Sequence, residues 1–162
     1  MKLYLVRHGP AESQSATGRD FDRALTVEGR ERVRLVAIEL GKRDEVPKRI
    51  IASPLRRAVE TAEAIVEALG LDLEIEQSED LAPGGGAIAL VRRLTAERAR
   101  KVMLVGHEPD MSLLTARLLG NWPGSFEKSM VLGLRVRARS DDGCSVESRF
   151  VLEPKTRRWV DL

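Results

Sequence analysis

The chain contains very few of the residues that build disulfides and most transition-metal sites. Among its 162 residues there is one cysteine, Cys144, and there are two histidines, His8 and His107. A single cysteine excludes an intramolecular disulfide framework and a cysteine-rich zinc site. Because histidine is so scarce, the surroundings of these two residues carry much of the information about function.

An excess of charge of one sign is also absent. The chain has 27 basic and 25 acidic residues, closely interspersed, for a net charge of +2. This balance argues against nucleic acid or a membrane surface as a partner, and the sparse aromatic residues do not interleave with basic ones. No apolar run is long enough to span a bilayer, and no N-terminal signal pattern is present. We therefore expect a cytoplasmic protein.

The composition that remains is that of an ordinary globular protein, with 43% hydrophobic and 32% charged residues. A chain of this length can bury a proper core without disulfides or metals. It shows no internal repeat, no low-complexity tract and no linker. We expect one domain over residues 1–162, and a monomer.

Strand and helix patterns alternate along the chain. Short apolar runs predict strands at residues 3–6, 49–52, 71–75, 102–105, 131–136 and 146–152. Helical spacing predicts helices between Thr26 and Gly41, after Ser53 as far as Gly70, at about 87–96, and from about 108 to 119. Thr26 and Ser53 are predicted N-caps. The order indicates an α/β three-layer sandwich with a mostly parallel sheet and a C-terminal antiparallel hairpin that turns at residues 141–143.

Two of the apolar strands end on a histidine, in the sequences LVRHG and LVGHE. Ligands bind at the carboxyl ends of parallel strands, so His8 and His107 are expected to converge at one edge of the sheet. A third strand-to-helix junction supplies Arg56 and Arg57. Two imidazoles, Arg7 and a second arginine would form a cationic pocket that suits a phosphoryl group, and phosphate or sulfate should bind there.

The chemistry of phosphoryl transfer fits these residue types. Arginine forks bind the equatorial oxygens of the transferred group and keep their charge at any working pH. A neutral imidazole can attack phosphorus, provided that its other ring nitrogen keeps its proton and donates it. We assign the nucleophile to His8 and charge stabilisation to His107. The residues alone would permit the reverse, and they do not decide between Arg56 and Arg57.

Four motifs, in order, resemble those of the histidine phosphatase superfamily. They are Arg7-His8-Gly9, Arg23-Ala24-Leu25-Thr26-x-x-Gly29, Ser53-x-x-x-Arg57-Ala58-x-x-Thr61 and Gly106-His107. With the compact length, they are similar to the SixA-type phosphohistidine phosphatases, whose fold is that of the phosphoglycerate mutases. The resemblance covers about residues 1–119.

The resemblance implies roles for individual residues. It makes His8 the phosphorylated nucleophile and Arg7, Arg57 and His107 the rest of the phosphate site, and it selects Arg57 over Arg56. It also implies that Arg23 reaches the phosphate; from the loop pattern alone, Arg23 could equally pair with a nearby aspartate, Asp20 or Asp22. SixA-like members need no metal, so we expect no metal and no cofactor.

The general acid is less defined than the nucleophile. Related branches place an acid directly after the late histidine or in a longer insertion, which leaves Glu108, Asp80 and Glu79, with Glu108 first. Glu108 could instead serve the positive end of the following helix. A phosphohistidine leaving group departs without strong acid catalysis, which favours a phosphorylated protein, such as a phosphotransfer or response-type domain, as substrate. The alternatives are a small phosphomonoester as substrate, or a non-catalytic module that binds phosphorylated partners.

Overall fold

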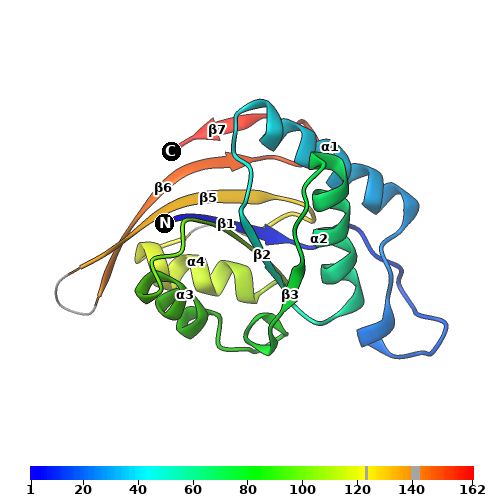
Figure 1. The fold of residues 1–162 in the computed structure, drawn as a ribbon. Helices are drawn as coiled ribbons and strands as arrows, with labels where there is room; N and C mark the ends of the chain where they lie inside the picture. Colours follow the sequence, from blue (N-terminus) through cyan, green and yellow to red (C-terminus); the bar gives the residue numbers. More distant parts are fainter. Residues whose placement is uncertain (123, 140–142) are drawn as a thin grey trace.

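The computed structural model describes residues 1–122, 124–139 and 143–162. Within this part of the chain, seven strands form one sheet in the order β3-β2-β4-β1-β5-β6-β7, with helices on both faces (Figure 1). The strands are β1 (Lys2–Arg7), β2 (Arg49–Ala52), β3 (Ile75–Gln77), β4 (Lys101–Gly106), β5 (Val131–Ala138), β6 (Cys144–Leu152) and β7 (Trp159–Asp161). The helices are η1 (Asp20–Asp22), α1 (Val27–Lys42), α2 (Arg56–Leu69), η2 (Glu79–Leu81), α3 (Ala87–Ala96) and α4 (Asp110–Leu119), of which η1 and η2 are single 3-10 turns.

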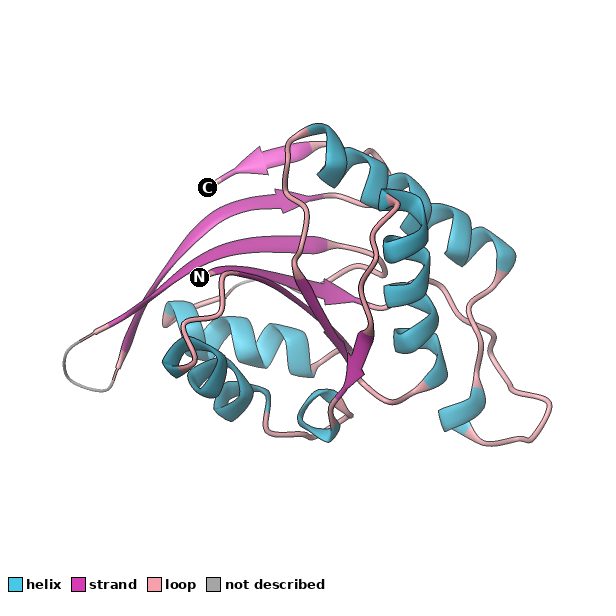
Figure 2. Ribbon diagram, in the orientation of Figure 1, coloured by secondary structure: helices cyan, strands magenta, loops and turns pink. Residues whose placement is uncertain are grey.

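The sheet is mixed, and its parallel half is the half with the helical crossovers. β1 pairs in parallel with β4, β4 with β2, and β2 with β3. On the other side of β1, β5, β6 and β7 follow in antiparallel pairing, and Figure 2 shows β5 and β6 extending beyond the helices. The α/β three-layer sandwich and its antiparallel C-terminal pair are thus confirmed. Residues 141 and 142 of the predicted hairpin turn lie outside the described residues.

Each face of the sheet has its own hydrophobic cluster, because successive side chains of a strand point to opposite faces. On β1, Leu3 and Leu5 pack with α3 and α4, whereas Tyr4 and Val6 pack with α1 and α2. All four side chains are buried. Burial on both faces explains why this strand reads as a continuous apolar run. None of the described helices is long and apolar enough to cross a membrane.

Helix α1 begins where its sequence predicts. The Thr26 side chain accepts a hydrogen bond from the main-chain N–H of Gly29, which is the N-cap geometry expected for α1. The second predicted N-cap is wrong. α2 begins at Arg56 with Leu55 at its N-cap, and the Ser53 hydroxyl instead lies against His107, because tertiary contact at the sheet edge takes its hydrogen bond.

Two strands differ from the prediction. The edge strand predicted at residues 71–75 lies at 75–77, so the alternating apolar residues before it lie outside the sheet. The C-terminal strand β7 was not predicted. Its Trp159 packs on Phe150 of β6, with ring centroids 4.6 Å apart, and under the Arg43 guanidinium. A strand of three residues held by such distant contacts leaves no local periodicity to detect.

Candidate active site

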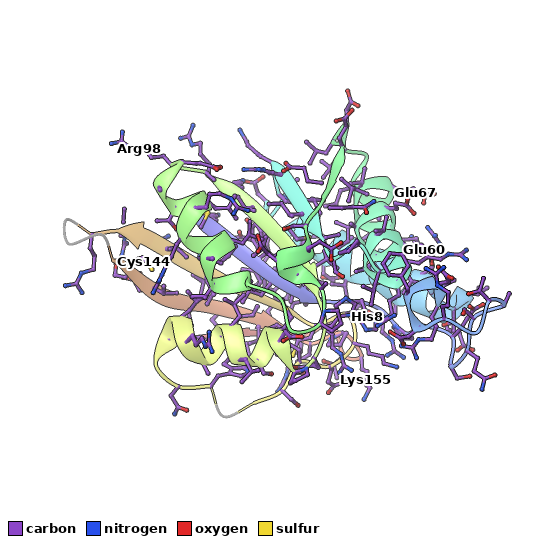
Figure 3. The ribbon with its side chains drawn as sticks, turned by 90° about the horizontal axis from the view of Figure 1, so that it is seen from below. His8, Glu60, Glu67, Arg98, Cys144 and Lys155 are labelled. Carbon is purple, nitrogen blue, oxygen red and sulfur yellow. The ribbon has the colours of Figure 1, made fainter. Side chains whose placement is uncertain are left out.

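His8 and His107 meet at the carboxyl edge of the parallel strands. In the β1–β4 register Arg7 lies opposite Gly106, and each histidine follows directly. The His8 main-chain N–H donates to the Gly106 carbonyl at 3.0 Å, and the two imidazole centroids are 5.1 Å apart. Figure 3 shows His8 at this edge, on the far side of the molecule from Arg98. The predicted convergence of the two histidines is confirmed.

One hydrogen bond fixes the tautomer of His8. Its Nδ1 lies 2.7 Å from the carbonyl oxygen of Gly9. A carbonyl only accepts, so Nδ1 carries the proton and donates it, which leaves the lone pair on Nε2. Gly9 is itself held, because its N–H donates to Thr61 Oγ1 at 3.0 Å and that hydroxyl donates to the Arg57 carbonyl at 2.7 Å.

Both imidazoles are neutral near pH 7. Burial, reinforced by the neighbouring His107 and arginine charges, lowers the pKa of His8 to about 3, against the opposing effect of the Gly9 hydrogen bond. Burial and the Arg57 charge lower the pKa of His107 to about 4. The side chains are almost inaccessible to solvent, with 6% and 3% of their residue surfaces exposed. A neutral imidazole with a free lone pair is the form that attacks phosphorus.

Ser53 sets the orientation of His107. The Ser53 hydroxyl lies 2.7 Å from His107 Nε2 and also accepts from the Leu55 N–H at 3.3 Å. Within the described part of the chain, Nε2 is the one acceptor within reach of the Ser53 proton, and with that proton donated to Nε2 the imidazole proton lies on Nδ1. Among the described residues, that buried Nδ1 has no partner. It is therefore free to donate to an oxyanion.

Arg7 is anchored on one side only. Its Nη1 donates to the Phe126 carbonyl at 2.7 Å, and its buried Nε has no hydrogen-bond partner in the described part of the chain. The turn before β5 also contacts the end of β1. The Ser129 N–H donates to the carbonyls of both Arg7 and His8, at 3.1 and 3.2 Å. Anchoring one edge of a guanidinium leaves the other edge for a ligand.

Arg57, on α2, is bound through both of its terminal nitrogens. Its Nη1 donates to the Asp20 carbonyl at 2.8 Å and its Nη2 to the Asp20 carboxylate at 3.0 Å. Its buried Nε has no partner in the described chain. Arg56, by contrast, is exposed and pairs with Glu60 at 2.8 Å. The two neighbours thus separate into one buried guanidinium at the sheet edge and one on the outer face of the helix.

Arg23 lies beside Arg57 and shares its partner. Its Nε forms an ion pair with Asp20 Oδ1 at 3.0 Å, which confirms pairing with a nearby aspartate. Asp22 turns elsewhere, toward Arg19 at 3.4 Å and the Thr17 hydroxyl at 2.5 Å. The 3-10 helix η1 therefore places the carboxylate of Asp20 in contact with Arg23 and Arg57, two of the predicted phosphate ligands.

Two of the three predicted acids have other partners, and the third is exposed. Glu108 accepts from the Ser112 hydroxyl at 2.7 Å, from the Ser112 N–H at 3.4 Å and from the Phe126 N–H. Asp80 lies 3.2 Å from Arg93 Nη2 and 3.3 Å from the Ser78 hydroxyl, and Glu79 is exposed. Glu108 thus binds the main-chain N–H of Phe126, the residue whose carbonyl anchors Arg7.

Sequence reasoning missed Ser129 and the contacts that Ser53 and Asp20 make in this site. Ser53 was predicted as a helix cap and Asp20 as a partner of Arg23, but the contacts of Ser53 with His107 and of Asp20 with Arg57 carry no local signal. Ser129 is 1% exposed and has a φ of 72°, uncommon for a residue with a side chain. Its only signal in the sequence is its place just before the strand that flanks β1. Among the described residues, no group of three or more His, Cys, Asp or Glu side chains is placed to hold a metal ion.

Comparisons with known proteins agree with this geometry. The family model described as histidine phosphatase superfamily (branch 1) matches residues 3–82. The phosphohistidine phosphatase SixA of Escherichia coli is 33% identical over 136 residues, covering 81% of this chain and 83% of SixA. An uncharacterized Picosynechococcus protein is 37% identical over 167 residues and covers 99% of both chains.

A solved structure gives the same result for the fold. The structure of the protein histidine phosphatase SixA complexed with tungstate has a TM-score of 0.87, with 26% identity, and covers 98% of this chain and 100% of that one. The family model over residues 3–82, the SixA relative over 81% of the chain and the SixA structure over 98% of it all indicate the same family. The chain belongs to the histidine phosphatase superfamily and, within it, to the SixA-type proteins.

Proposed function

We propose that this protein hydrolyses the phosphoryl group of phosphohistidine on a partner protein, with His8 as the nucleophile. The observation that carries the proposal is the His8–Gly9 hydrogen bond of 2.7 Å, which leaves the Nε2 lone pair of a neutral imidazole beside unpartnered donors of Arg7, Arg57 and His107. The name of the E. coli relative and the tungstate complex of the SixA structure support it. Tungstate, like phosphate, is an oxyanion.

In the first step, His8 Nε2 attacks phosphorus in line with the bond that breaks. The new bond joins Nε2 to phosphorus, and the old P–N bond gives its electron pair to the leaving imidazole, which takes a proton from solvent. Charge on the equatorial oxygens is stabilised by Arg7, Arg57 and the His107 Nδ1–H, with Arg23 as a further ligand. His8 Nδ1 keeps its proton and its contact with Gly9 throughout.

In the second step, water attacks phospho-His8. An oxygen–phosphorus bond forms, the P–N bond to Nε2 breaks and returns its electron pair to His8, and the proton of water leaves with phosphate or solvent. The same donors serve both steps because the same three oxygens carry the charge. No external reductant, oxidant or cofactor enters this balance.

Phosphohistidine is favoured over a phosphate ester by the leaving group. An alkoxide is far more basic than an imidazole and needs a proton from a positioned acid. Glu108 is bound by Ser112 and the Phe126 peptide, and Asp80 by Arg93. We propose that Glu108 positions Arg7 through Phe126, whose N–H donates to Glu108 and whose carbonyl accepts from Arg7. A role for Glu108 as general acid stays a prediction. The cytoplasmic location and the monomeric state also stay predictions.

The test compares substrate classes at one enzyme concentration. Phosphate release is measured from a phosphotransfer domain phosphorylated on histidine and from a panel of sugar and nucleotide monophosphates, with wild type and His8→Ala. We expect fast release from the protein substrate and loss of release in the variant. Turnover of a small phosphomonoester alone would overturn the substrate, and stable binding of the phosphorylated domain without turnover would overturn the enzymatic role.

A further inference from the structure

The Asp20 carboxylate forms ion pairs with Arg57 and Arg23, two of the arginines to which the proposed function assigns phosphate binding. Its Oδ2 is 3.0 Å from Arg57 Nη2, and its Oδ1 is 3.0 Å from Arg23 Nε. Each carboxylate oxygen is thus engaged by a different arginine. Two oxygens of a phosphoryl group would use donors on these same two side chains.

The exposures of the three side chains place Asp20 on the outside. The Arg57 side chain is 5% exposed and that of Arg23 is 26% exposed, whereas the Asp20 side chain is 65% exposed. Asp20 therefore covers Arg57 from the solvent side. An exposed carboxylate is held by ion pairs that water and salt screen, so it can leave them at little cost.

The main chain anchors Arg57 independently of this carboxylate. The Asp20 carbonyl accepts from Arg57 Nη1 at 2.8 Å, and a change of the Asp20 side chain leaves that bond in place. The guanidinium is also fixed by its own burial. The carboxylate therefore adds negative charge beside Arg57 without being needed to position that guanidinium.

We propose that Asp20 is an internal anion that competes with the incoming phosphoryl group for Arg57 and Arg23, and so selects for dianionic ligands. The proposal rests on the proposed function in taking Arg57 as a phosphate ligand. A carboxylate or phosphodiester carries one negative charge and gains from the arginines no more than Asp20 gives up. A phosphoryl dianion carries two, so its Coulomb attraction is about twice as large and it displaces Asp20.

The adjacent Asp22 provides a matched control. It lies on the same 3-10 helix and carries the same charge, but its partners are Arg19 and Thr17. Asp22→Asn changes the net charge of the protein as much as Asp20→Asn does. It leaves the Asp20–Arg57 contact untouched.

The experiment measures ligand binding rather than turnover. Wild type, Asp20→Asn, Asp20→Ala and Asp22→Asn are titrated with inorganic phosphate at about pH 8, where it is mainly dianionic, and with acetate. Binding is followed by the ring-proton NMR signals of the two histidines, His8 and His107.

We expect both Asp20 variants to bind phosphate about three- to tenfold more tightly than wild type, with acetate binding gained, because a competing charge is removed. Asp22→Asn should bind as wild type does. Equal or weaker phosphate binding by the Asp20 variants, or an equal gain in Asp22→Asn, would overturn the competition. If wild type and all variants fail to bind phosphate, the proposed function falls instead.

Discussion

The imidazole of His8 is held by the carbonyl of the next residue: its Nδ1 lies 2.7 Å from the Gly9 carbonyl oxygen. A residue that binds its own neighbour's main chain has its ring orientation fixed by backbone geometry. The Gly9 N–H is bound in turn by Thr61 from α2. The strand end, the tautomer of His8 and the first turns of α2 therefore form one connected unit.

Gly9→Ala should lower kcat while the fold persists. A Cβ at Gly9 would lie 2.8 Å from Val33 Cγ2 and 3.3 Å from the Gly29 carbonyl oxygen. Val33 is buried and stiff at χ1, and the carbonyl is main chain, so the Gly9 peptide itself must shift. We expect kcat for phosphohistidine to fall about 10- to 100-fold. A variant as active as wild type would show that the Gly9 carbonyl does not set the tautomer.

Thr61→Val should destabilise the protein, and Thr61→Ser should not. The Thr61 hydroxyl accepts from the Gly9 N–H and donates to the Arg57 carbonyl in a fully buried position. Valine keeps the shape but leaves the buried Gly9 N–H without its partner, which costs about 1–3 kcal/mol, whereas the Arg57 carbonyl keeps its main-chain bond within α2. Urea unfolding measures this difference, with serine as the matched control because it restores the hydroxyl. Equal midpoints for valine and wild type would contradict the account.

Stability should fall as the pH falls from 7 to 5. The chain has only two histidines, and both have folded-state pKa values, about 3 and about 4, below the usual 6.5. In this window the unfolded chain binds more protons than the folded one, so acid favours unfolding by up to about 1.4 kcal/mol per pH unit for each histidine.

Urea unfolding at pH 7 and pH 5 tests this dependence. The doubly substituted variant His8→Asn, His107→Asn should show a much flatter profile over the same window. Glu45, whose pKa is lowered to about 2 chiefly by hydrogen bonds that outweigh its burial, contributes only at lower pH. A wild-type stability that is unchanged between pH 7 and pH 5 would mean that the histidines are not held neutral.

Glu108→Gln and Glu108→Ala should separate a positioning role from an acid role. Glutamine retains an oxygen that accepts from the Phe126 N–H, and the Phe126 carbonyl holds Arg7. We expect Glu108→Gln to keep most of its activity on phosphohistidine, and Glu108→Ala to raise KM about tenfold or more through Arg7. Loss of kcat in Glu108→Gln, with a lost acid limb in the pH profile, would assign it the acid role.

Local chemistry allowed much of the fold to be predicted. Thr26 caps α1 because its side chain reaches the N–H three residues ahead, and the bounds of β2 and α3 follow their apolar runs. Where a distant group took the hydrogen bond, prediction failed: Ser53 has cap chemistry but binds His107. The short strand β7 depends on packing against Phe150, which no local pattern encodes.

In the candidate site too, some features could be predicted from the sequence and others depend on tertiary contacts. The meeting of His8 and His107 could be predicted, because both follow buried strands that end at one edge of a parallel sheet. The choice between Arg56 and Arg57 required a family motif, since periodicity does not fix which of two neighbours is buried. The contact of Asp20 with Arg57 depends on how the 11–23 segment folds back over α2, and no spacing in the sequence reports it.

The most direct test of the central claim is capture of the covalent intermediate. Wild type, His8→Ala and His107→Ala are mixed with a phosphotransfer domain carrying radioactive phosphohistidine, quenched in alkali within the first turnover, and the label is mapped by peptide digestion. The account predicts label on Nε2 of His8 in wild type, and none in His8→Ala. Label on His107, or phosphate release by His8→Ala at the wild-type rate, would contradict it.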